Sequence, residues 1–213
     1  MKKLLFALAF AGLTSSAAMA QETEIPTEKY SVATNRFWSN WFIQGSGFYG
    51  TYSRGGQAWN LFKKDNSNFG FGVAIGKWFT PSLGIRAKFQ GLQAKENGDK
   101  FDAYLTRFDI MGNLCNLFGG YKPGRGFKLQ GFAGPGVAFT LKDPKNTSAT
   151  FNGSLLAGIP VTDNLDINLG LTGVIFNDKF DGKEGGIAVD ANSAGTIGIT
   201  WNFDKLGWTK TSK

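Results

Sequence analysis

Six charged side chains recur on one face of a series of alternating segments, and they are the residues best placed to do chemistry. They are Arg86, Lys88, Arg107, Asp109, Lys128 and Asp166. Charges held in a narrow protein interior must pair, because an unpaired buried charge is strongly unfavourable. We therefore expect an ion-pair network with a structural or gating role. Four cations against two anions also fit a narrow path that favours anions, so this alternative stays open.

Histidine-dependent catalysis is excluded, and nothing in the sequence points to catalysis by Asp or Lys without histidine. The chain contains no histidine, so a Ser–His or His–Asp arrangement cannot be built. Gly45–Gly50 matches G-x-G-x-x-G, but no helix is predicted to begin there, which indicates glycines in a strand. We expect no catalytic site and no cofactor-binding site.

Metal and nucleic-acid sites are also not expected. Asp178, Asp181 and Glu184 have a spacing that matches no calcium-binding loop. The single cysteine, Cys115, is predicted to face inward without a second ligand. The net charge of +7 is not gathered in a basic run, so it is no signal for nucleic acid.

The elements that must position the charges alternate with a period of two. The clearest is the hairpin Asn68–Gln90, where Phe and Ile residues oppose Gly and Ala before the turn at residues 80–82. Similar segments predict eight strands, at residues 41–53, 68–79, 83–90, 104–118, 127–141, 149–161, 165–176 and 195–203. The faces of the first strand stay unassigned, and Pro135 predicts a bulge.

The connections separate into two kinds. Polar or charged loops are predicted at residues 54–67, 95–100, 142–148 and 177–194, and shorter turns at 80–82, 119–126 and 162–164. Since consecutive strands alternate in direction, the loops gather at one end. An even number of strands with this arrangement is typical of bacterial outer-membrane β-barrels.

The two faces of the strands favour a membrane barrel over a soluble one. The apolar face carries one charge, Lys77, near a turn, and a cation at the lipid-facing midplane costs about 2–4 kcal/mol. In a soluble barrel the large apolar residues would have to fit inside, where eight strands leave little room. We predict an all-β, eight-stranded antiparallel up-and-down transmembrane barrel over residues 41–203, and the soluble exported barrel is the alternative.

Both ends of the chain fit an exported protein. Residues 1–20 have the charged start, apolar stretch and Ala18-Met19-Ala20 ending of a signal peptide cleaved after Ala20. Residues 21–40 form a leading segment and residues 204–213 a short basic tail. The predicted location is the outer membrane of a Gram-negative cell, among lipid and lipopolysaccharide.

Residues 113–121, the glycines at 131, 134 and 136, and the segment Gly195–Phe203 resemble the barrel domain of outer membrane protein A-like proteins. The resemblance implies that Trp201 and Phe203 form the signal read by the barrel assembly machinery. The ten residues after Phe203 cannot hold that family's peptidoglycan-binding domain, so cell-wall anchoring is not expected.

The function expected from these features is a mainly structural, non-enzymatic role in membrane integrity. The inward charges would close the barrel, and the loops would be exposed at the cell surface. A small anion-favouring pore and a surface adhesin or receptor with an unknown ligand are the alternatives.

Overall fold

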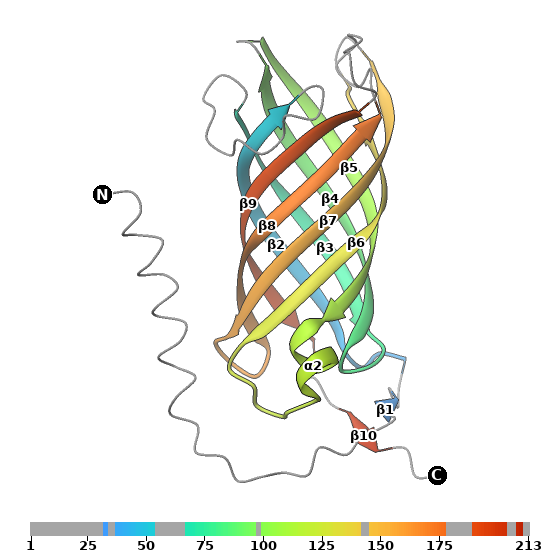
Figure 1. Ribbon diagram of the computed structural model, residues 1–213, viewed down its shortest axis with the longest axis vertical. Helices are drawn as coiled ribbons and strands as arrows, with labels where there is room; N and C mark the ends of the chain where they lie inside the picture. Colours follow the sequence, from blue (N-terminus) through green and yellow to red (C-terminus); the bar gives the residue numbers. More distant parts are fainter. Residues whose placement is uncertain are drawn as a thin grey trace, which may run out of the picture.

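Eight antiparallel strands close into a barrel in which each strand pairs with its neighbours in the chain and the last strand pairs with the first (Figure 1). The computed structural model describes residues 32–33, 37–53, 67–96, 99–141, 145–177, 189–203 and 208–210. The strands of the barrel are β2 (Trp41–Ser53), β3 (Ser67–Trp78), β4 (Leu83–Glu96), β5 (Asp99–Asn113), β6 (Lys128–Phe139), β7 (Thr147–Pro160), β8 (Leu165–Asn177) and β9 (Val189–Asn202). The predicted signal peptide and most of the leading segment lie outside the described residues.

The connections divide the barrel into two ends. We call the end with connections 54–66, 97–98, 140–146 and 178–188 the loop end, and the end with connections 79–82, 114–127 and 161–164 the turn end. The predicted loop at 95–100 is wrong, because Lys95 pairs with Lys100 and Glu96 with Asp99 in the β4–β5 ladder. The last predicted loop is also too long, since β9 begins at Val189.

Period-two alternation divides the side chains of the wall into inward and outward sets. Phe71, Val73 and Ile75 of β3 point outward and are exposed, whereas Gly72 and Ala74 between them are buried. In β2, whose faces the sequence left unassigned, Phe42, Gln44, Ser46, Phe48 and Tyr52 are the buried, inward-facing residues. The large apolar side chains therefore form the outer surface of most of the wall.

Lys77, the charge predicted on the apolar face, is buried at the turn end beneath residues 37–41. Its Nζ donates hydrogen bonds to the carbonyl oxygens of Phe37 and, at 3.0 Å, Ser39. The same Nζ lies 5.3 Å from the ring centroid of Phe37 and 5.5 Å from that of Trp41. Carbonyl dipoles and aromatic faces thus solvate this ammonium group on the outer wall.

The strand predicted to run to Phe118 ends at Asn113, and α2 (Leu114–Gly119) follows it. Asn113 caps this helix, since its side-chain oxygen accepts a hydrogen bond from the Asn116 amide at 3.2 Å. Cys115 is therefore not on the inner wall as predicted. Its Sγ accepts a hydrogen bond from the Leu129 amide at 3.3 Å at the turn end.

The bulge predicted at Pro135 is absent from the described ladders. Pro135 pairs with Phe151 in a register that is constant along β6 and β7. The register between β5 and β6 is also the same on both sides of Pro135, with only the pairs opposite Phe108 and Asp109 missing. Because a proline lacks the amide donor, the ladder is interrupted without an inserted residue.

Part of the basic tail returns to the barrel. The short strands β1 (Val32–Ala33) and β10 (Thr209–Lys210) pair with each other at the turn end (Figure 1). Trp208, just before β10, packs against buried side chains inside the barrel mouth. Within the described ranges, no helix is long and apolar enough to cross a membrane.

Candidate functional site in the barrel interior

The inner wall of β4 and β5 carries four of the predicted charges, which we call the β4–β5 cluster: Arg86, Lys88, Arg107 and Asp109. The register sets Arg86 opposite Asp109 and Lys88 opposite Arg107. Each of the four residues is at most 4% exposed. Inward positions on neighbouring strands are close enough for ion pairs, so alternation and register alone bring the cluster together.

Asp109 is the carboxylate of this cluster, and Arg86 is its main partner. Its Oδ2 accepts hydrogen bonds from Arg86 Nε at 2.9 Å and from Arg86 Nη2. Arg107 is more distant, with Nε 3.7 Å from the same oxygen. Two charge-assisted hydrogen bonds from one guanidinium to the same oxygen fix the geometry of the Arg86–Asp109 pair.

Arg86 also extends the network over the inner face of β3 to β2. Its Nη1 donates to Gln44 Oε1 at 2.8 Å, and Gln44 Nε2 donates to Thr200 Oγ1 of β9 at 3.0 Å. Asn168 of β8 donates to the same hydroxyl at 2.8 Å. Five strands are therefore connected through polar side chains inside the barrel.

The small residues of β3 make room for this crossing. Gly76 is the cross-strand partner of both Arg86 and Phe42. A β-carbon at Gly76 would lie 2.4 Å from the Phe42 ring, and one at Gly72 would lie 2.9 Å from Lys88 Cε. The Gly and Ala face of β3 therefore leaves space for the long side chains of β2 and β4.

Lys128 and Asp166 form a second, separate ion pair. Lys128 Nζ lies 2.8 Å from both carboxylate oxygens of Asp166. The two residues come from β6 and β8, and the pair spans β7, where Lys128 faces Gly158. Their side chains are 18% and 6% exposed, so this pair is closer to solvent than the β4–β5 cluster.

The β4–β5 cluster holds more positive than negative groups. Its three cations face one carboxylate, and Lys88 stands directly opposite Arg107. In the part of the chain that the structure describes, Arg107 Nε and Nη1 and Asp109 Oδ1 are buried without a hydrogen-bond partner. The Arg86–Asp109 contact is therefore well made, whereas Arg107 and Lys88 are held in a less favourable environment.

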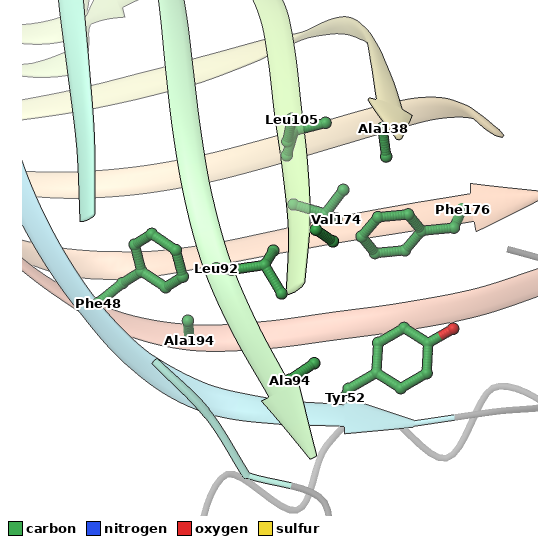
Figure 2. Packing of buried hydrophobic residues seen from close by; sticks show 10 residues of the cluster. Phe48, Tyr52, Leu92, Ala94, Leu105, Ala138, Val174, Phe176 and Ala194 are labelled. Carbon is green, nitrogen blue, oxygen red and sulfur yellow. The ribbon is translucent and has the colours of Figure 1, made fainter. Parts of the chain in front are cut away.

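Two apolar layers enclose the β4–β5 cluster along the barrel axis. The loop-end layer consists of Phe48, Tyr52, Leu92, Ala94, Ala103, Leu105, Ala138, Val174, Phe176 and Ala194 (Figure 2). The turn-end layer consists of Phe42, Trp78, Met111, Phe132 and Leu156, with Trp208 packed against it. Along β5 the inward side chains read Met111, Asp109, Arg107 and Leu105, so the charges lie between the layers.

Aromatic contacts pack the loop-end layer, and a cation–π contact joins the turn-end layer to the β4–β5 cluster. The ring of Tyr52 meets Phe101 and Phe176 edge to face, with centroid distances of 5.7 and 6.0 Å. The guanidinium carbon of Arg86 lies 3.8 Å from the centroid of Phe132, a cation–π contact that joins the cluster to the turn-end layer. Two cavities of about 10 Å³, one beside each layer, each have room for about one water molecule.

All six charges predicted from the sequence thus lie on the inner wall, but in two groups rather than in one network. Trp201 and Phe203 are half exposed on the outside at the turn end. Sequence reasoning missed Gln44, because the alternation of β2 is poor. It also missed the cation–π contact of Phe132 with Arg86 and the packing of Trp208 against the turn-end layer. The local sequence pattern gives no signal for either contact.

Other candidate sites gain no support. Gly45–Gly50 lies within β2, as its strand interpretation predicts. Among the described residues, no group of His, Cys, Asp or Glu could hold a metal ion. Asp178, Asp181 and Glu184 lie outside the described residues.

The comparisons with known proteins agree with a barrel of the outer membrane. No family model matches the chain. Outer membrane protein 40 of Porphyromonas gingivalis is 29% identical over 98% of this chain, and the chain spans 59% of the length of that protein. Among solved structures, Neisserial surface protein A is 14% identical, matches 78% of this chain and 98% of its own, and has a TM-score of 0.56.

The N-terminal β-barrel domain of OprF from Pseudomonas aeruginosa has the same coverage and identity, with a TM-score of 0.49. The closed eight-stranded barrel and its outer-membrane neighbours confirm the predicted fold class, the outer-membrane location and the resemblance to small barrels of the outer membrane protein A type.

Proposed function

We propose that this chain, an eight-stranded β-barrel protein of the outer membrane, serves a mainly structural and non-enzymatic role as a closed membrane barrel. The observation that carries the proposal is the filled interior, in which the β4–β5 cluster lies between two apolar layers. A water-filled path needs polar lining along its whole length. Phe, Trp, Leu and Met side chains occupy the lumen on both sides of the β4–β5 cluster, which favours a closed barrel.

The six inward charges would then act as structural residues. The Arg86–Gln44–Thr200 connection ties β4 to β2 and β9, next to the seam where the barrel closes. Lys128 and Asp166 tie β6 to β8. Contacts that span non-adjacent strands resist deformation of the wall, which suits a protein that maintains membrane integrity.

A small anion-favouring pore is the second candidate, and the surplus of cations in the β4–β5 cluster supports it. Opening would require both apolar layers to rearrange. A role as a surface adhesin or receptor depends on connections at the loop end, most of whose residues lie outside those that the structure describes, and its ligand is unknown.

We also propose that the last barrel strand is recognised by a partner protein during assembly. Trp201 and Phe203 lie at the end of the final barrel strand with their side chains outward. This placement leaves them accessible to a protein that captures the strand before it pairs with β2. The barrel assembly machinery is the proposed partner, and lipid and lipopolysaccharide surround the finished barrel.

The conductance of the refolded protein in a planar bilayer tests the closed barrel. We expect the wild type to be silent, and a variant with Leu105→Ala, Arg107→Ala and Met111→Ala to show openings, because it shortens three inward side chains of one strand. The matched control is Thr106→Ala, Phe108→Ala and Ile110→Ala, which changes the outward face of β5. Steady anion-selective current from the wild type would instead make the protein a pore.

A further inference from the structure

The helix α2 lies against the outside of the barrel wall, at the turn end. A β-carbon at Gly112 would be 3.4 Å from Leu117 Cδ1, and one at Gly131 would be 3.8 Å from Leu114 Cδ2. Gly112 and Gly131 are cross-strand partners on β5 and β6. Both stand at outward positions, so the two leucines pack on the face of the wall that meets lipid.

The wall is notched where the helix sits. On either side of the two glycines, Gly112 pairs with Leu83 and Gly131 pairs with Leu155. These flanking leucines face outward and are 48% and 45% exposed. Leu114 and Leu117 of α2 therefore fill a gap of two small residues in an otherwise continuous apolar band.

The helix is held firmly in this place. Besides the Asn113 cap and the Cys115 contact to Leu129, Asn116 Nδ2 donates to the Pro81 carbonyl oxygen at 2.8 Å. Pro81 belongs to the neighbouring turn. These bonds attach α2 to β5, to β6 and to the β3–β4 connection, which fixes the direction of its exposed face.

That exposed face is apolar. Phe118 is 87% exposed and Leu117 is 47% exposed. At the same end of the barrel, Trp38, Phe79, Trp201 and Phe203 are exposed aromatic residues, as expected for an interfacial girdle. On β5 and β6 the outward positions at this end are Gly112 and Gly131, which have no side chain to contribute to the girdle. The exposed side chains of α2 take their place.

We propose that α2 is an interfacial membrane helix, which inserts Phe118 and Leu117 into the phospholipid leaflet on the turn-end side. The occupant of this face is lipid because the face continues the apolar band of the barrel. In outer-membrane barrels short turns face the periplasm, so the leaflet is the inner one. A helix with one apolar face lies along the boundary of headgroups and acyl chains.

Site-directed fluorescence in vesicles tests this proposal. All variants carry Cys115→Ser, whose hydroxyl can accept the same hydrogen bond from Leu129. An environment-sensitive fluorophore is attached at Phe118→Cys, at Phe108→Cys as the lipid-facing reference, and at Pro123→Cys as the exposed reference in the same connection. The proteins are refolded into phosphatidylcholine vesicles with and without brominated acyl chains.

We expect the label at position 118 to emit at short wavelength and to be quenched by bromine, as at position 108. A label at 118 that behaves like the label at 123 would overturn the proposal. Phe118→Ser provides a second readout, because this side chain makes little contact with protein. We expect it to lower the denaturant midpoint in vesicles, and an unchanged midpoint would contradict insertion.

Discussion

Both groups of charges in the barrel occupy inward positions, yet the β4–β5 cluster has three cations for one carboxylate, whereas Lys128 and Asp166 are balanced. The cluster lies deep between the apolar layers, and its Lys88 and Arg107 face each other across one ladder. Lys128 reaches over Gly158 to Asp166, nearer the turn-end mouth, and both oxygens of that carboxylate accept hydrogen bonds.

The difference shows that burial and pairing are separate properties of an inward charge. The Lys128–Asp166 pair resembles an ordinary, partly shielded salt bridge. In the β4–β5 cluster, one carboxylate compensates several buried cations, so its removal leaves more uncompensated charge. Substitutions that remove one charge at a time can measure this contrast.

The largest effect is expected for Asp109→Asn. This change leaves Arg86, Lys88 and Arg107 without an anion, and breaking a buried pair in this way destabilises a protein by about 3–5 kcal/mol. The free energy of unfolding in urea, measured in lipid vesicles, gives the effect. If Asp109→Asn lowers the free energy of unfolding by less than Asp166→Asn does, the carboxylate of Asp109 is not what stabilises the cluster.

A smaller effect is expected for Asp166→Asn. The partner Lys128 is partly exposed and can reach water at the turn end, so the loss of pairing should destabilise the barrel by about 1 kcal/mol. The same urea titration measures it. If the loss equals that of Asp109→Asn, the two groups of charges do not differ in burial as described.

The smallest effect, of opposite sign, is expected for Lys88→Met. Lys88 opposes Arg107 directly, and like charges at opposed positions destabilise a sheet. An apolar residue of similar length should leave stability unchanged or raise it by up to about 1 kcal/mol. Lys128→Met is the matched control and should destabilise. Destabilisation by Lys88→Met would instead reveal a favourable partner of that ammonium group.

Much of the wall could be predicted from the sequence, because lipid and lumen impose two different environments on alternate residues. The strand Trp41–Ser53 has the predicted bounds, and the cluster follows from alternation along β4 and β5. The start of β9 was missed, since residues 189–194 show no clear alternation. The bulge predicted at Pro135 was wrong, because the missing amide donor interrupts the β5–β6 ladder without shifting its register.

The helix α2 and the contact of Arg86 with Gln44 over β3 could not be predicted, for a different reason. Leu114, Leu117 and Phe118 also fit a strand, and only the notch at Gly112 and Gly131 gives them a place as a helix. Gln44 becomes part of the network because the inward residues of β3 are small. The long side chains of β2 and β4 can therefore meet over that strand. Both features depend on which strands become neighbours, which a local pattern does not contain.

The pairing of β9 with β2 has a consequence for how the barrel forms. The other wall ladders join segments that follow each other in the chain, whereas this seam joins Phe42 to Asn202. Closing so long a loop carries the largest entropic penalty, so the seam should be the last ladder to form and should limit the folding rate. Trp208 packs against the turn-end layer, and Phe42 of that layer lies on a strand of the seam. In a variant whose other five tryptophans are replaced by phenylalanine, the fluorescence of Trp208 should report on closure and distinguish an open sheet from a finished barrel during refolding.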